Sequence, residues 1–560
     1  MMNDKFNCLW FLPFSEFEND VNTEIALING FHTFGHSNTV VRCGGYLNTY
    51  CTPMNGNRLK EESPNLIKAI ICKSCKQKGN TANKIINGNF IDQTNFISME
   101  DRLSIENIIN EVDFRNWKDF KFKNIPIGRY ASYEVILNNK INPDELNEGK
   151  FHEKYRISLK NSLLCAISFA KIIELTRFDV LFVRNSLYSI NRVACWMAND
   201  RNIKAYSMQN EGVLGDGVRR LYINKWDKHP KDLYSSTKFL TILNNNIEKS
   251  TNKFIEKYTT DKEKSKSLLT YSEPTKNLST RKIRNNIGIK NQQKIILVTL
   301  SSGDENNAAE TIGVIPDRSE SDIFLNQNAW IKFLLNFADE NPDLNFIFRI
   351  HPREKRNRRD NVESSNYPKL LKILGQVPNN VYVNNPEDKV SIYDIFSISD
   401  ININFGSSTG LDTLAMGIPT ITQDTHLNLG YPGEIGNIAL SKNDYSRLIR
   451  ELINSRPDVH SQHRAGKWIY FLTNYATLSV GDEGSKHGIS QLEEYFKNFI
   501  FKLGKGIVFL NLLKKLVSIL SNSINLRVDI KEQKIVDIEN QLSQLFNTIL
   551  ENESHYIKKV

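Results

Sequence analysis

Short apolar runs of strand length alternate along the chain with longer segments in which apolar residues recur at helical spacing. In the first half, this pattern predicts strands at residues 8–13, 179–183 and 204–208, and helices at 25–34 and 189–198. Strands that alternate with helices are typical of βαβ units, whose strands pair in parallel. The pattern therefore predicts an α/β fold.

The alternation stops in a polar stretch, residues 247–291, and then resumes. The next predicted strands lie at 294–300, 345–350 and 401–405, with helices between them. We therefore expect two Rossmann-like, doubly wound domains. The predicted boundaries are 1–270 for the N-terminal domain and 280–500 for the C-terminal domain.

Residues 501–560 read as a helical tail. Residues 506–520 are apolar with two lysines, and the apolar positions beyond them follow three-, four- and seven-residue spacing. Three interpretations stay open: a helix packed on the body of the protein, a short coiled coil that makes a homo-oligomer, and peripheral contact with a membrane interface.

Composition fits a globular protein that stays inside the cell. Of the 560 residues, 40% are hydrophobic and 24% charged, and no apolar run reaches the 18 or more residues of a membrane-spanning helix. The first twenty residues lack the basic region and the long apolar region of a signal peptide. We expect a cytoplasmic protein.

The net charge of +9 would suit nucleic acid, anionic lipid or a phosphorylated substrate. Its densest basic run is residues 353–359. Because the chain has no aromatic–basic stacking motif and no recognisable nucleic-acid-binding module, we expect no nucleic-acid partner.

Seven cysteines in a cytoplasmic chain favour free thiols or a metal site over disulfides. A Cys-x-x-Cys pair with two further thiols fits a four-thiolate structural zinc site, formed by Cys43, Cys51, Cys72 and Cys75. Unligated thiols are the alternative. His32 and His36 lie four residues apart on a predicted helix and are alternative ligands.

The segment richest in chemistry is Arg349-Ile350-His351-Pro352, at the end of a predicted strand. Proline holds the preceding residue in an extended conformation, so His351 would stand at the mouth of the strand. There an imidazole can donate to a phosphate or protonate a departing phosphate oxygen. The alternative is a histidine that only caps the strand end.

Two further loops follow predicted strands. The first contains Gly406, Ser407, Ser408 and Thr409 and leads to Asp412, and its small residues would present N–H groups and hydroxyls to an anion. Asp412 would either accept ribose hydroxyls or complement a helix dipole. The second loop offers the polar side chains of Ser301, Ser302 and Asp304 to a phosphate or base. No P-loop lysine is present, so nucleotide hydrolysis is not indicated.

Taken in order, these segments resemble the capsule-polysaccharide biosynthesis proteins and the related bacterial sialyl- and Kdo-transferases of the GT-B fold. The resemblance covers about residues 294–437. It implies that His351-Pro352 and Ser407-Ser408 hold the phosphate of a CMP-sugar. The family's catalytic base lies in an acidic pair followed by glycine, and the nearest match is Asn210-Glu211-Gly212, with Asn in the first position. Glu211 is thus the candidate base and Asp216 the reserve, unless the loop is only a glycine-rich turn.

The resemblance implies a glycosyltransferase that passes a sugar from a nucleotide-sugar, with a CMP-sugar favoured, to a saccharide acceptor that is lipid-linked or part of a surface polysaccharide. Catalysis would require no cofactor. Two alternatives remain: a polyol-phosphate transferase of the teichoic-acid type, and a non-catalytic scaffold of a polysaccharide-assembly complex.

Overall fold

The computed structural model describes residues 5–214, 218–228, 237–244, 248–264, 271–315, 323–357, 361–388, 390–423 and 431–482. The predicted tail at 501–560 and the reserve residue Asp216 lie outside these ranges. Within them, no helix is both long and apolar enough to span a membrane.

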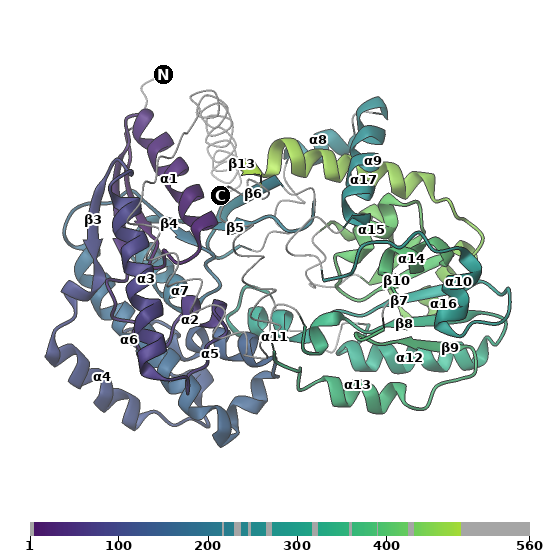
Figure 1. The fold of residues 1–560 in the computed structure, drawn as a ribbon, viewed down its shortest axis with the longest axis horizontal. Coiled ribbons are helices and arrows are strands. Elements are labelled where there is room, and N and C mark those ends of the chain that lie inside the picture. The colour runs from purple at the N-terminus through teal and green to yellow at the C-terminus, as the bar shows by residue number, and fades with distance from the viewer. Residues whose placement is uncertain are drawn as a thin grey trace, which may run out of the picture.

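The protein has two α/β domains, each built on a mainly parallel sheet (Figure 1). The first sheet has the strand order β13-β6-β5-β4-β1-β2-β3. Its strands are β1 (Asn7–Phe11), β2 (Ser37–Arg42), β3 (Asn89–Asp92), β4 (Val180–Arg184), β5 (Lys204–Asn210), β6 (Val218–Lys225) and β13 (Leu478–Asp482). Strands β1 to β5 are parallel, whereas β6 runs antiparallel to β5 and β13 antiparallel to β6.

The second sheet has the order β12-β11-β10-β7-β8-β9, and every pair in it is parallel. Its strands are β7 (Ile295–Thr299), β8 (Asn345–Arg349), β9 (Val381–Asn384), β10 (Ile401–Asn404), β11 (Thr420–Gln423) and β12 (Asn437–Ala439). These two sheets confirm the fold class expected from the sequence.

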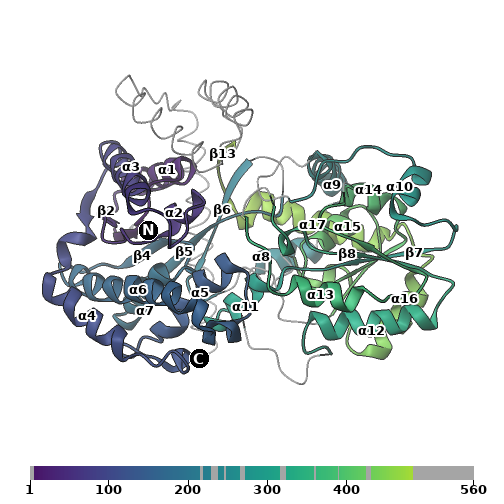
Figure 2. The ribbon, with the colours of Figure 1, turned by 60° about the horizontal axis from the view of Figure 1, so that its bottom comes forward.

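Helices cover both faces of each sheet (Figures 1 and 2). The first domain contains α1 (Glu18–Thr33), α2 (Thr52–Gly56), α3 (Asn65–Asn83), α4 (Met99–Glu111), α5 (Ile127–Asn139), α6 (His152–Ile173) and α7 (Ser189–Asp200). The second contains α10 (Thr280–Ile287), α11 (Gly303–Thr311), α12 (Gln327–Glu340), α13 (Tyr367–Leu374), α14 (Ile392–Ile398), α15 (Thr409–Ala415) and α16 (Lys442–Leu452).

Strand β1 shows why the central strands read as continuous apolar runs. Leu9 and Phe11 belong to one core cluster, while Cys8 and Trp10, which point the other way, belong to a second. All four are at most 1% exposed. A strand buried on both faces has no polar side, so its sequence does not alternate.

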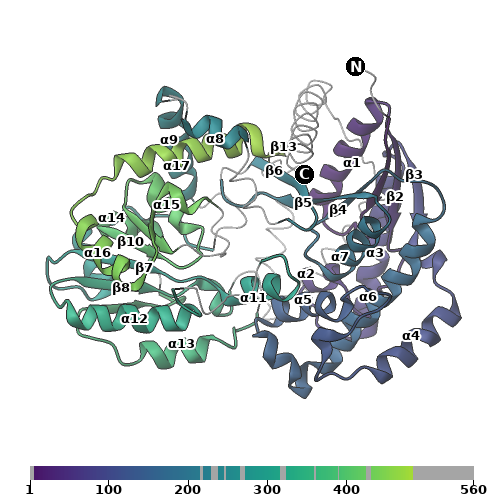
Figure 3. The same ribbon diagram turned by 180° about the vertical axis from the view of Figure 1, so that it is seen from behind.

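The chain passes between the domains more than once. Helices α8 (Thr237–Asn244) and α9 (Glu248–Glu263) follow the last hairpin of the first sheet, yet both pack on α17 (Val459–Phe471) (Figure 3). From α17 the chain returns to the first sheet as β13. A second contact joins α5 of the first domain to α11 of the second.

Candidate active site

The three predicted segments start at one edge of the second sheet. Strand β7 pairs with β10 on one side and with β8 on the other, so that Thr299 lies opposite both Asn404 and Arg349. Each of these residues ends its strand. The loops that follow therefore emerge side by side at the carboxyl edge, where open α/β sheets bind their ligands.

His351 presents one ring nitrogen as a donor. Its Nδ1 accepts a hydrogen bond from the backbone N–H of Arg353 at 3.2 Å, which leaves the proton on Nε2. Burial, together with the charges of Arg353 and Arg349, lowers the pKa of His351 to about 3. The imidazole is therefore neutral at physiological pH, and it suits hydrogen bonding to a phosphate better than proton transfer to a leaving group.

The two nearby arginines are already engaged. The guanidinium of Arg349 donates to Asn384 of the neighbouring strand, and burial lowers the pKa of Arg349 to about 10. Arg353 donates to both oxygens of Asp304, the shorter contact being 2.6 Å, and to Tyr271 at 3.3 Å. Arg353 thus anchors the His351 turn to α11. Both carboxylate oxygens of Asp304 are engaged by this arginine.

Ser301 and Ser302 are less accessible to a ligand than the sequence predicted. The backbone N–H and the hydroxyl of Ser301 both bond to Gln327 Oε1, at 2.8 and 3.4 Å. Ser302 is the N-cap residue of α11, and its side chain is buried without making a capping bond. The loop that contains them is a packed turn whose polar groups are largely committed to the protein.

The loop from Gly406 to Thr409 keeps one exposed hydroxyl. Asn404 fixes the turn by accepting from the Ser407 N–H at 2.8 Å, and the Ser407 hydroxyl lies 2.8 Å from that of Thr409. Gly406 has a φ of +68°, which favours glycine. Ser408, by contrast, is exposed, so its hydroxyl is the one that this turn presents to the outside.

Asp412 is buried beneath this loop. It accepts a hydrogen bond of 2.5 Å from the hydroxyl of Tyr258, and Lys262 Nζ lies 3.7 Å from the same carboxylate. Burial raises the pKa of Asp412 while Lys262 and Tyr258 oppose that rise. Its observed role is to bind α9 to α15.

Glu211 lies near the same lysine. Its Oε1 accepts from the backbone N–H groups of Val213 and Leu214, the latter at 3.0 Å, and from Tyr222 at 3.4 Å. Burial raises the pKa of Glu211, and among the opposing influences is the charge of Lys262. The structure therefore brings Glu211 of the first domain close to the Tyr258–Lys262–Asp412 cluster, but it also gives one of its oxygens a structural role.

The sequence did not predict a role for Glu134, which lies on α5. Its Oε1 accepts from the backbone N–H and the hydroxyl of Ser189 at 2.9 and 2.8 Å, whereas its Oε2 has no hydrogen-bond partner among the described residues. Burial raises the pKa of Glu134 to about 7. One sequence feature could have indicated this residue: in Tyr133-Glu134-Val135 an acid stands among apolar residues on a helix. Because buried acids are rare, such an acid is a candidate functional residue.

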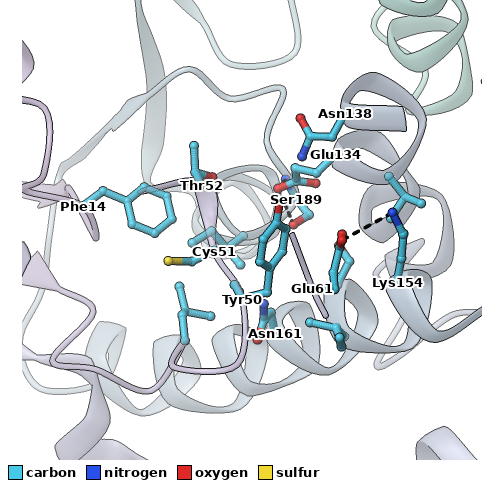
Figure 4. A pocket seen from close by; sticks show the side chains of 15 residues that line it. Phe14, Tyr50, Cys51, Thr52, Glu61, Glu134, Asn138, Lys154, Asn161 and Ser189 are labelled. Carbon is cyan, nitrogen blue, oxygen red and sulfur yellow. Dashed lines mark hydrogen bonds and ion pairs between the residues drawn. The ribbon is translucent and has the colours of Figure 1, made fainter. Parts of the chain in front are cut away.

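Glu134 lines a pocket in the first domain (Figure 4). Figure 4 shows Glu134 beside Ser189, and Glu61 paired with Lys154 on the same wall, at 3.4 Å. The cavity has both polar and apolar lining, including Phe14, Tyr50, Thr52, Asn138, Asn161 and Ile190. Hydrogen-bonding groups combined with aromatic rings are the surface that a saccharide needs.

This cavity lies close to the His351 turn. Leu137, one helical turn after Glu134, accepts a hydrogen bond at 3.4 Å from the guanidinium of Arg353 through its backbone carbonyl. Arg353 is two residues from His351. Glu134 of the first domain and the imidazole of His351 in the second are thus linked through a short chain of contacts across the domain junction.

The four cysteines of the predicted zinc site come from three segments, two of them from α3, and they line a second pocket. Burial raises the pKa of all four thiols, that of Cys43 to about 12 and that of Cys75 to about 11. As free thiols they are protonated and unsuited to nucleophilic catalysis. His36 packs against Phe6 and Phe31 instead.

Known proteins resemble the chain only distantly. No protein-family model matches it, and no curated protein sequence does. Among solved structures, a glycosyltransferase from Rickettsia africae is 11% identical with a TM-score of 0.30, over 84% of this chain and 94% of that one. A UDP-GlcNAc 2-epimerase from Neisseria meningitidis bound to UDP-GlcNAc is 10% identical with a TM-score of 0.27, over 82% and 95%.

A third solved structure is KpsC from Thermosulfurimonas dismutans, a β-Kdo 2,7-transferase. It is 14% identical with a TM-score of 0.29, over 56% of this chain and 82% of that one. The fold class rests on the two sheets described above, and these likenesses add no argument about activity.

Proposed function

We propose that the protein is a glycosyltransferase that takes a sugar from a nucleotide-sugar, with a CMP-sugar favoured, and passes it to a saccharide acceptor. We place it in the cytoplasm, where an acceptor of surface polysaccharide or a lipid-linked saccharide would meet it at the inner face of the membrane. The observation that carries the proposal is the neutral Nε2–H of His351 at the same sheet edge as the exposed Ser408 turn.

In this proposal the second domain binds the donor. The Nε2–H of His351 and the hydroxyl of Ser408 donate to the phosphate, and these bonds strengthen as charge develops on the departing nucleotide. Pro352 starts the short helix after His351 and so fixes the position of the ring. No metal is needed if protein donors hold the phosphate.

The first domain binds the acceptor in the cavity beside Glu134. With a pKa of about 7, Glu134 is poised to take a proton from an attacking hydroxyl at physiological pH. Its Oε2 has no hydrogen-bond partner among the described residues, whereas Glu211 already uses Oε1 to hold its own turn. We therefore favour Glu134 as the base, and we keep Glu211 as the alternative that the family resemblance implies.

Calorimetry with CMP, CDP, UDP and GDP tests the donor side, with wild type and His351→Ala measured side by side. We expect CMP to bind best and the variant to lose at least tenfold in affinity, which corresponds to the loss of about one charge-assisted hydrogen bond. A preference for UDP or GDP would change the donor class, and one for CDP would favour the polyol-phosphate transferase.

If no nucleotide binds, the enzyme proposal fails and the scaffold of a polysaccharide-assembly complex replaces it. If CMP binds equally to both forms, the nucleotide site lies elsewhere in the protein. Release of sugar from a CMP-sugar without acceptor would then separate an enzyme from a nucleotide-binding scaffold.

A further inference from the structure

Arg42, the last residue of β2, is a buried cation at the carboxyl edge of the first sheet. Its Nη1 donates to the backbone carbonyl of Leu12 at 2.9 Å and to Glu24 Oε2 at 3.2 Å. Burial raises the pKa of Glu24 to about 7, so at physiological pH this carboxyl offsets the charge of Arg42 only in part. The carboxyl edge of an open α/β sheet is where such folds bind their ligands.

Two other nitrogens of the Arg42 guanidinium lack partners. Although the residue is only 5% exposed, its Nε and Nη2 have no hydrogen-bond partner among the described residues. These two nitrogens present their N–H groups on the same edge of the planar guanidinium, and such a fork binds both oxygens of a carboxylate or a phosphate. Because buried donors without a partner are rare and costly, the fork indicates a binding site for an oxyanion.

Arg42 lines the pocket that the four cysteines also line. Lys76 and Asn80 of α3 belong to the same lining, in which Asp92 is the only acid among the described residues. No group of three or more His, Cys, Asp or Glu side chains in the described ranges is placed to hold a metal ion. Two cations against one acid make the lining positive, so it favours an anion.

The pocket has room for a charged group of a few atoms rather than for a whole sugar ring. Gly45 has a φ of +101°, and a Cβ added there would lie 3.8 Å from both Lys76 Nζ and Cys72 Sγ. A side chain at this position would therefore fill part of the space beside Lys76. Glycine leaves that space open for a small ligand.

This pocket adjoins the proposed acceptor pocket beside Glu134. Phe14, Leu47 and Cys51 line both, so the two pockets share a wall. Figure 4 shows Phe14 and Cys51 in that wall. An acceptor that occupies the first pocket therefore has the second as its neighbour.

We infer that Arg42 and Lys76 bind a negatively charged group of the acceptor, either a carboxylate or a phosphate. The inference rests on the proposed acceptor site, and it narrows the acceptor to an acidic saccharide or a phosphorylated one. The Arg42 fork holds two oxygens of the group, and the Lys76 ammonium adds a second positive charge.

Saturation-transfer nuclear magnetic resonance on the full chain tests the inference, since it detects weak binding to a large protein. The probes are methyl glucuronoside, which carries a carboxylate, glucose 6-phosphate, and the neutral methyl glucoside. We expect at least one acidic probe to bind about tenfold more tightly than the neutral one. Tighter binding of the carboxylate would identify an acidic sugar, and tighter binding of the phosphate a phosphorylated acceptor.

Lys76→Gln and Lys73→Gln form a matched pair, because both lysines are exposed on α3 but Lys76 alone of the two lines the pocket. Lys76→Gln should weaken binding of the acidic probe about threefold, whereas Lys73→Gln should not change it. Arg42→Gln should weaken it about tenfold or more. If circular dichroism shows that Arg42→Gln is unfolded, the two lysine variants decide.

Equal affinity for the neutral and acidic probes would overturn the inference, and so would equal effects of the two lysine variants. Calorimetry with CMP separates this result from the proposed function. If CMP binds and no acidic probe does, the inference about the acceptor fails while the transferase proposal stands. If an acidic probe binds through Lys76 and CMP does not bind, the anion site stands without the transferase.

Discussion

Lys140 Nζ donates a hydrogen bond of 2.7 Å to the backbone carbonyl of Arg353, across the junction of the two domains. The same ammonium group donates to the carbonyls of Val362 at 2.7 Å and Lys355 at 3.3 Å. Its side chain is almost fully buried. One lysine of the first domain thus organises the whole turn that follows His351 in the second.

Replacement of this lysine should loosen the turn. Lys140→Met keeps the length of the side chain but removes three donors, and we expect the free energy of unfolding to fall by about 2–3 kcal/mol. Nucleotide binding should weaken as well. Lys123→Met is the matched control, because Lys123 has a similar backbone conformation, with φ of 47° against 50°, but is exposed. Thermal unfolding of both variants measures the difference; equal melting temperatures would contradict the role assigned to Lys140.

The protonation state of His351 can be measured directly. Because burial and neighbouring arginines lower its pKa to about 3, its ring should not titrate between about pH 5 and pH 8, where an ordinary histidine does. Nuclear magnetic resonance of the ring nitrogens in protein labelled at histidine tests this, with His351→Ala to assign the signal. A titration midpoint near 6.5 would show that the imidazole is available as an acid.

Glu134 should set the pH dependence of glycosyl transfer. A base with a pKa of about 7 gives a rate that rises as the pH rises through 7. Glu134→Gln should lower the rate by about a hundredfold or more and remove that rise. Glu211→Gln should leave the profile in place. If the second variant alone abolishes the rise, the base is Glu211.

Stability gives an independent measure of Glu134. Its pKa is raised in the folded protein from an ordinary value of 4.5, so the folded state holds a proton that the unfolded chain releases. Stability therefore falls as the pH rises from about 4.5 to about 7. Denaturant unfolding of Glu134→Gln should show a smaller fall over that window than the wild type.

Gly410 is required by the packing beneath the Ser408 turn. A Cβ there would lie 1.9 Å from the hydroxyl of Tyr431 and 2.3 Å from Asn404 Nδ2, and Asn404 is the side chain that fixes the turn. Gly410→Ala should cost about 2 kcal/mol and weaken nucleotide binding. Gly149→Ala is the control, since nothing lies within 4 Å of its added Cβ. Unfolding and calorimetry of the two variants check the prediction.

The sequence predicted best what local hydrophobicity determines. The runs at 294–300 and 345–350 became β7 and β8 because their residues are buried on both faces, and such runs are readable without knowing the partners. The Gly406 turn also followed from its residues, since glycine and hydroxyl side chains favour a turn after a strand.

What the sequence did not predict depends on partners far along the chain. Glu134 gains its hydrogen bonds from Ser189, 55 residues away, and Lys140 donates to carbonyls more than 200 residues away. Asp412 was expected to face a ribose or a helix dipole, but Tyr258 reaches it from a helix that packs there only in the folded protein. Periodicity within one segment carries no information about such contacts.

Strand β13 returns to the first sheet and covers β6, which would otherwise be the edge of that sheet. A fragment that stops before Leu478 would expose the main-chain donors and acceptors of β6, and open edges of this kind recruit other chains. A soluble fragment of the first domain would therefore have to carry β13 with it, joined by a linker after Lys225. Cutting the chain once between the two domains would produce a protein prone to aggregate.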